Sequence, residues 1–133
     1  MSELSSESYL EALRWLKQAN EELKVSIHLA QTDGMPPRTA CFHAHLAAEL
    51  GLKSCFIFFE IPFKKMHDLI ALNSIISERL SYQVALTDLE QLNPWVIEGR
   101  YPGDIPDVDT ATAKKCVNSA ERILSTIKKQ ISG

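Results

Sequence analysis

The chain has 133 residues, of which 45% are hydrophobic and 23% charged, a composition typical of one globular domain with a single core. No stretch approaches the roughly 18 consecutive apolar residues of a membrane-spanning helix, so we expect no contact with a membrane. The formal net charge of −3 argues against nucleic-acid binding through bulk charge, and a polyanion would have to meet a local basic cluster.

The first residues and the cysteines both favour a cytoplasmic protein. Residues 1–7 contain acidic and hydroxyl side chains and no basic, apolar signal region. The three cysteines are an odd number without metal-like spacing, and Cys41 and Cys55 lie too far apart on one predicted helix to form a disulfide. We therefore expect a reducing cytoplasmic location.

Two long helices are predicted in the first half of the chain. Apolar residues recur at helical spacing over 6–31, and the glycine and prolines within 32–37 end that helix. Residues 38–59 form a second helix that is apolar in nearly every direction. Such a helix is surrounded by neighbours, so we place it at the centre of a bundle or in a dimer interface as well.

Three further helices are predicted in the second half. Asp68 is a suitable N-cap for a helix that ends near Arg79, and Pro94 interrupts a shorter helix over 84–98. A loop over 99–107 precedes a last helix, which Asp109 or Thr110 caps and which ends near residue 131. No segment alternates like a strand. Residues 1–133 are therefore expected to form one all-α domain, an antiparallel up-and-down bundle of four to five helices.

A polar stripe crosses the apolar second helix. At 100° per residue, His45, Glu49 and Lys53 lie one above another, and Arg38 falls on the same side. The polar side chains of such a stripe must form hydrogen bonds with other residues or with water. The stripe is either a helix-stabilising pair of Glu49 with Lys53 or the lining of a pocket or groove.

Arg38 and His43 have the residue types that metal-free RNA cleavage needs. An arginine can hold a phosphate while a histidine moves a proton. On a regular helix, however, five residues place the two side chains about 140° apart. They converge only if the first turn is irregular or if two subunits meet there.

The loop before the last helix places a cation beside an aromatic ring. Arg100 and Tyr101 could bind a phosphate and stack on a base, or Arg100 could pair with Glu49 or Asp68 and anchor the loop. His67 and Asp68 are expected to belong to a helix cap. No metal or cofactor site is expected, since His43 and His45 point about 200° apart and no Cys or carboxylate completes a ligand set.

Several short segments form a series over nearly the whole chain, and they are Ala12, Trp15, Leu16, 19–23, 40–44, 47–49, Lys53, 67–69, Leu72 and 100–102. In their residues and their order, these segments resemble prokaryotic HEPN domains. The resemblance implies a bundle of about five helices, commonly dimeric, that binds nucleotides or RNA. Relatives are often encoded beside a minimal nucleotidyltransferase, in toxin–antitoxin pairs whose HEPN protein is a ribonuclease. Those nucleases carry an Arg, four to six residues and then His in a later helix, whereas no histidine follows Arg100 here.

We therefore expect a homodimeric module that binds a nucleotide or RNA, with a minimal nucleotidyltransferase as its candidate protein partner. RNA cleavage is expected to be weak or absent. One alternative is a metal-independent ribonuclease toxin that uses Arg38 and His43, and another is an adaptor or oligomerisation bundle without a small ligand. The candidate nucleotide-binding residues are Arg100, Tyr101, Lys53, His45 and Glu49.

Overall fold

The computed structural model describes residues 6–63, 65–96 and 101–132 of the chain. It contains five α-helices, which are α1 (Ser6–Gln31), α2 (Pro37–Phe58), α3 (Leu69–Ile76), α4 (Leu86–Leu92) and α5 (Thr110–Ser132). Short 3-10 turns follow α3 at Ser77–Arg79 and α4 at Asn93–Trp95, and a third lies at Pro102–Asp104. No strand occurs in these described ranges, so the all-α prediction is confirmed. Within the same ranges, no helix is both long and apolar enough to cross a bilayer.

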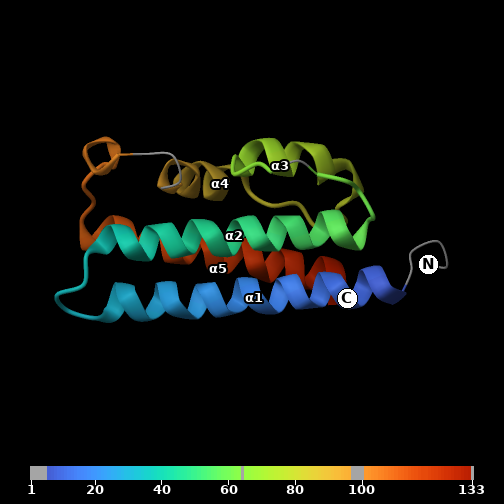
Figure 1. Cartoon of the computed structure of the whole chain (residues 1–133), viewed down its shortest axis with the longest axis horizontal. Helices are drawn as coiled ribbons and strands as arrows, with labels where there is room; N and C mark the ends of the chain where they lie inside the picture. Colours follow the sequence, from blue (N-terminus) through green and yellow to red (C-terminus); the bar gives the residue numbers. More distant parts are fainter. Residues whose placement is uncertain (1–5, 64, 97–100, 133) are drawn as a thin grey trace.

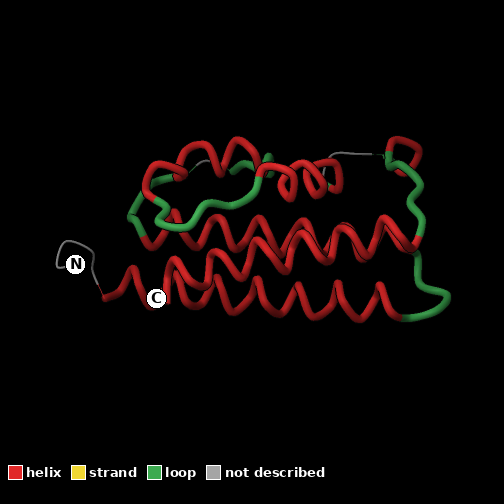
Figure 2. The backbone as a smooth tube through the Cα atoms, turned by 180° about the vertical axis from the view of Figure 1, so that it is seen from behind, coloured by secondary structure: helices red, strands yellow, loops and turns green. Residues whose placement is uncertain are grey.

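The three long helices lie side by side, and α3 and α4 cover the other side of α2 (Figures 1 and 2). α1 runs antiparallel to both α2 and α5. α2 and α5 run in the same direction, because the segment between them returns along the bundle. The predicted central place of α2 is confirmed, since it contacts all four other helices. Its fully buried side chains include Cys41, Leu52, Cys55 and Phe56.

α2 and α5 approach each other closely at Gly51. A Cβ atom added at Gly51 would meet Leu124 Cδ2 at 2.5 Å and Ile127 Cδ1 at 3.1 Å. Only a residue without a side chain leaves room for these two side chains in the core. Gly51 therefore sets the distance at which the central helix packs on the last one.

Polar side chains fix the short helices. Asp68 is the N-cap of α3, as predicted, and accepts hydrogen bonds from the backbone N–H groups of Ile70 and Ala71 at 3.0 and 3.1 Å. Both hydrogen bonds lower the pKa of Asp68, and the one from Ala71 has the larger effect. Asp109 likewise accepts a hydrogen bond from the N–H of Thr112 at the start of the long helix α5.

Two of the predicted helices are shorter than expected. The helix predicted over 68–79 ends in a 3-10 turn, and in the helix predicted over 84–98 Pro94 turns the chain after Leu92.

The three cysteines are buried and form no disulfide. Burial raises the pKa of Cys55 to about 12, which keeps its thiol protonated at neutral pH. The Cys116 thiol also donates a hydrogen bond to the Gln91 carbonyl oxygen at 3.8 Å.

Candidate functional site

The polar stripe of α2 meets a histidine from the loop before α3, and together they form a buried cluster. We call His45, Glu49, Lys53 and His67 the polar cluster. The Lys53 Nζ donates to Glu49 Oε2 at 2.8 Å, and His67 Nδ1 lies 3.1 Å from both carboxylate oxygens of Glu49. One carboxylate thus joins an ammonium from its own helix to an imidazole 18 residues further along the chain.

His45 connects the cluster to the loop backbone. Its Nε2 lies 3.1 Å from the carbonyl oxygen of His67, and because a carbonyl only accepts, Nε2 carries the hydrogen. The side chain is 2% exposed. Burial lowers the pKa of His45 to about 4, since a charged imidazolium would lose its hydration; Glu49 opposes this shift, and His67 adds to it. His45 is therefore a neutral donor at pH 7.

Lys53 is a buried ammonium with few acceptors. Its side chain is 9% exposed, and its Nζ lies 5.6 Å from the centroid of the Phe63 ring. An ammonium has three hydrogens to donate. Among the described residues, Glu49 is its one hydrogen-bond partner. Further anionic or carbonyl oxygens could therefore bind to Lys53 without displacing Glu49.

Phe63 separates the polar cluster from an apolar groove. The groove has a volume of 320 Å³ and is lined by Pro62, Phe63, Met66, Leu72 and Ile75. Ligand sites typically combine an apolar hollow of at least roughly 300 Å³ with a few polar groups. The groove and the cluster together offer an apolar wall, an aromatic ring and a cation. Chemically, this combination suits a flat apolar group that carries a negative charge.

The HEPN domain family profile matches residues 12–130. The chain belongs to the HEPN domain family. The fold also resembles the crystal structure of an archaeal HEPN homologue, with a TM-score of 0.63 and 25% sequence identity over 90% of this chain and 97% of that one. No curated protein sequence matches the chain.

The HEPN fold brings together three of the predicted site residues and leaves the other described ones apart. His45, Glu49 and Lys53 lie in the polar cluster as their spacing predicted. Arg38, which the spacing also placed on this side, is exposed near the start of α2 and has no described partner in the cluster. Tyr101 is 79% exposed, and Arg100 lies outside the described residues.

His43, predicted as a partner of Arg38, pairs with a carboxylate of α1 instead. Its Nδ1 lies 2.7 Å from Glu22 Oε1, and both side chains are partly buried. No hydrogen bond joins His43 to Arg38 within the described part of the chain. Nor do the described side chains form a group of three His, Cys, Asp or Glu that could hold a metal ion.

Sequence reasoning did not find His67 and Phe63 as members of the site. Both lie in the loop between α2 and α3, where no periodicity indicates which way a side chain points. A signal was present, because an apolar helix with a buried Glu and Lys needs a polar partner from elsewhere in the chain. His67 is the nearest titratable residue before the α3 cap.

Proposed function

We propose that this HEPN domain binds a nucleotide or the end of an RNA at the polar cluster and the adjoining groove. The observation that carries the proposal is the incompletely satisfied ammonium of Lys53 beside the Phe63 ring. A phosphate oxygen would take the remaining hydrogens of Lys53, and charge-assisted hydrogen bonds of this kind are strong. The base would lie on the apolar wall of Phe63, Met66 and Leu72.

Arg100 and Tyr101 remain the predicted contributors from the loop before α5. Replacing Arg100 with alanine is expected to weaken mononucleotide binding more than tenfold, through the loss of about 1.5–3 kcal/mol from one charge-assisted contact. Isothermal titration with a panel of ribonucleotides measures this change. Arg79→Ala, which removes another exposed cation, is the matched control and should bind like the wild type. A less stable Arg100→Ala protein with unchanged nucleotide affinity would show that Arg100 only anchors the loop.

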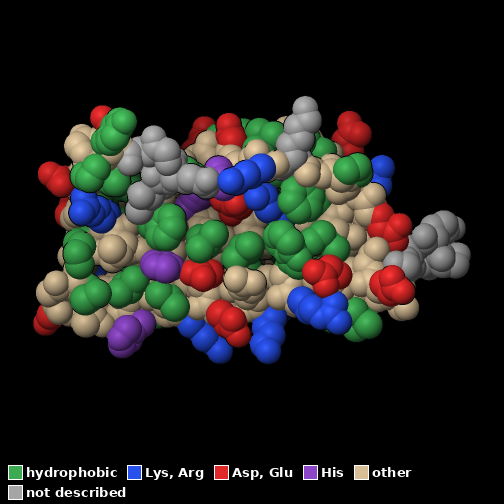
Figure 3. Space-filling view, in the orientation of Figure 1, with side chains coloured by type: hydrophobic (Ala, Val, Ile, Leu, Met, Phe, Trp, Pro, Cys, Tyr) green, Lys and Arg blue, Asp and Glu red, His purple; other side chains and the backbone are tan. Residues whose placement is uncertain are grey.

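The domain is also proposed to be a homodimer, through the outward side of α2. After Arg38, the two charged residues of this helix are Glu49 and Lys53, and both are buried beneath the loop that contains Phe63 and His67. The outward positions are apolar and partly exposed, and they are Phe42, Leu46, Leu50 and Ile57. Figure 3 shows hydrophobic side chains in a row over α2. A contiguous apolar row on a surface helix marks a protein interface, and a second copy offers the same row.

Replacing Leu46 with glutamate is expected to convert the dimer to a monomer, because each interface would then bury two unpaired carboxylates. Size-exclusion chromatography with light scattering should show the mass fall from twice 14.9 kDa to 14.9 kDa. Leu86→Glu alters an exposed leucine of α4 outside the row and should leave the dimer intact. A wild-type protein that is monomeric at micromolar concentration would contradict the proposal.

A minimal nucleotidyltransferase remains the proposed protein partner, in a pair of the toxin–antitoxin type, and the cytoplasm remains the proposed location. The partner rests on the family, and the location rests on the unpaired cysteines. In the described residues, no contact between Arg38 and His43 supports the ribonuclease alternative.

A further inference from the structure

The charge of the chain is unevenly distributed, and α5 is its basic part. α5 contains five lysines and arginines and one glutamate, a formal charge of +4, whereas the whole chain is −3. The remaining residues together therefore carry −7. A polyanion that approaches the molecule would be attracted to α5 and repelled elsewhere.

The charged residues of α5 all lie on its exposed side. Lys115, Arg122 and Lys129 are seven residues apart and line up along the helix at intervals of about 10 Å. Lys114, Glu121 and Lys128 form a second row beside them. We call the exposed positions of this helix the α5 face: Thr110, Ala111, Lys114, Lys115, Asn118, Glu121, Arg122, Ser125, Lys128 and Lys129.

Four of the five cations are available to a partner. Arg122 is engaged, because its Nη2 donates to Asp88 Oδ1 at 2.8 Å and its Nε lies 3.1 Å from both oxygens of that carboxylate. None of the four lysines forms an ion pair with another described residue. The lysine pairs at the two ends of α5 are therefore solvated charges.

The chemistry of the α5 face fits a phosphate backbone better than a protein surface. Lysine is depleted in protein–protein interfaces, whose centres are apolar and aromatic, and the α5 face has no large apolar side chain. The amide of Asn118 and the hydroxyl of Ser125 lie between the two lysine pairs. Lysine, asparagine and serine are among the side chains that contact phosphate and sugar.

An aromatic ring adjoins the C-terminal lysine pair. Tyr82 is 52% exposed, and Lys129 Nζ lies 5.9 Å from the centroid of its ring. The Gln130 Oε1 accepts from the backbone N–H groups of Ser81 and Tyr82, which holds this loop against α5. An exposed aromatic ring beside cations is how proteins stack unpaired bases without reading their sequence.

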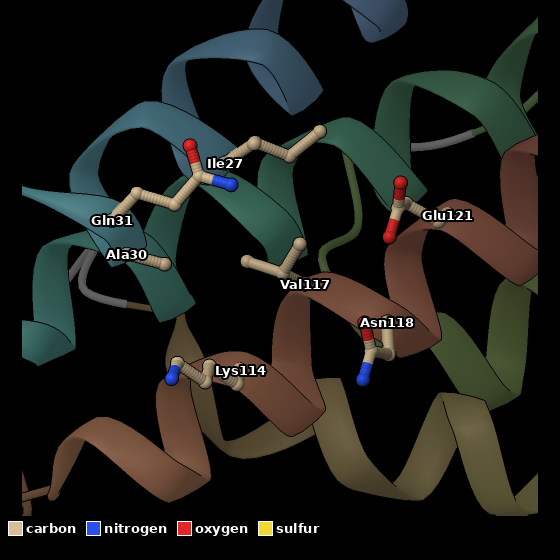
Figure 4. Close-up of a pocket in the computed structure, with 7 residues that line it drawn as sticks. All are labelled: Ile27, Ala30, Gln31, Lys114, Val117, Asn118 and Glu121. Atoms are coloured by element: carbon tan, nitrogen blue, oxygen red, sulfur yellow. The ribbon is translucent and has the colours of Figure 1, made fainter.

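A groove lies at the edge of the α5 face, where this helix meets α1 (Figure 4). Ile27, Ala30 and Val117 provide its apolar wall, and Lys114, Asn118 and Glu121 lie at its α5 side. With a volume of 250 Å³, it is smaller than a typical site for a whole ligand of roughly 300 Å³ or more. It has room for one unstacked base beside the N-terminal lysine pair.

We propose that the α5 face, with Tyr82, binds the backbone of single-stranded RNA as a second surface of the protein. The inference rests on the proposed function in one respect, since it assumes that the ligand is built of nucleotides. It adds a site on a different helix and names the ligand class as a polynucleotide. In this scheme a mononucleotide would occupy the polar cluster, whereas the α5 face would bind the backbone of a polynucleotide.

The test is the affinity for a fluorescent oligouridine, measured by anisotropy over a series of salt concentrations. For single strands, the slope of log K against log salt changes by about 0.7 for each phosphate contact. The variant Lys128→Gln/Lys129→Gln should therefore lower the slope by about 1.4, and Lys114→Gln/Lys115→Gln should do the same. Tyr82→Ala should weaken binding about tenfold by the loss of stacking, without changing the slope.

The matched control is Lys17→Gln/Lys24→Gln, which removes two exposed lysines from α1 and changes the net charge equally. It should leave the slope as in the wild type. An equal loss in this control would overturn the proposal, and so would the absence of oligouridine binding. Competition by polyglutamate as effective as by RNA would also overturn it, because the surface would then suit an acidic protein.

The same proteins are titrated with mononucleotides to separate this inference from the proposed function. If the two lysine-pair variants lose affinity for RNA while their mononucleotide affinity is unchanged, both proposals stand, and the two sites are separate. If RNA binds through α5 and no mononucleotide binds, the polar-cluster proposal fails while the α5 face stands.

Discussion

Replacing Glu49 with leucine is expected to lower the free energy of unfolding by about 3–5 kcal/mol. The Glu49 carboxylate is the described hydrogen-bond partner of the buried Lys53 ammonium and also binds His67. Without it, Lys53 would be an uncompensated charge on a side chain that is 9% exposed. Urea denaturation at fixed protein concentration measures the loss, since a dimer's stability depends on concentration.

Two variants separate charge burial from other causes. The double substitution Glu49→Leu/Lys53→Met should recover most of the lost stability, because replacing both members of a buried pair with apolar residues is often neutral. Arg14→Ala breaks the exposed Arg14–Glu11 pair, leaves the hydrogen bond from Trp15 to Glu11 in place, and should cost no more than about 1 kcal/mol. If Glu49→Leu costs as little as Arg14→Ala, the cluster is solvated and Lys53 is not an unsatisfied buried cation.

The helices were predictable because their signals are local. Apolar spacing located α1, and the uniformly apolar texture of residues 38–59 placed α2 at the centre of the bundle. Asp68 and Asp109 marked helix starts through their capping side chains. The shorter α4 shows where local signals conflict, because helical periodicity continues past Leu92 while Pro94 removes a backbone donor.

The site was only partly predictable because two of its five residues join it through tertiary contacts. Helical spacing alone aligned His45, Glu49 and Lys53, since four-residue steps stay on one side of a helix. His67 and Phe63 join them from an irregular loop, where sequence distance gives no direction. Arg38 was placed on the same side by its spacing but does not join the cluster. Its angle around the helix fits, but it lies in the exposed first turn of α2.

Long-range ion pairs and charge distribution were also hidden in the sequence. The contact of Asp88 with Arg122 and Ser119, which joins α4 to α5, spans 34 residues between the two charges. The net charge of −3 argued against polyanion binding, because an average over the chain conceals a helix with a charge of +4. A charge count for each predicted helix would have revealed it.

The stability of the protein should fall as the pH is lowered from 6.5 towards 4, and His45 should cause about 3 kcal/mol of this loss. In the folded state the pKa of His45 is about 4, whereas the pKa of a histidine in an unfolded chain is 6.5. Between these values the unfolded chain binds a proton that the folded chain excludes. Acidification therefore favours unfolding, and the contribution is fully present above pH 6.5.

The variant His45→Gln provides the measurement, because glutamine keeps an N–H donor for the His67 carbonyl but does not titrate. Its free energy of unfolding should depend on pH less steeply than that of the wild type across this window. The carboxylates titrate in both proteins and cancel in the difference between the two curves. Parallel curves would mean that His45 takes up a proton in the folded state, so that the cluster is open to water. In that case Lys53 would also be solvated, and the polar cluster would lose the dry surroundings that give its cation a strong hold on phosphate.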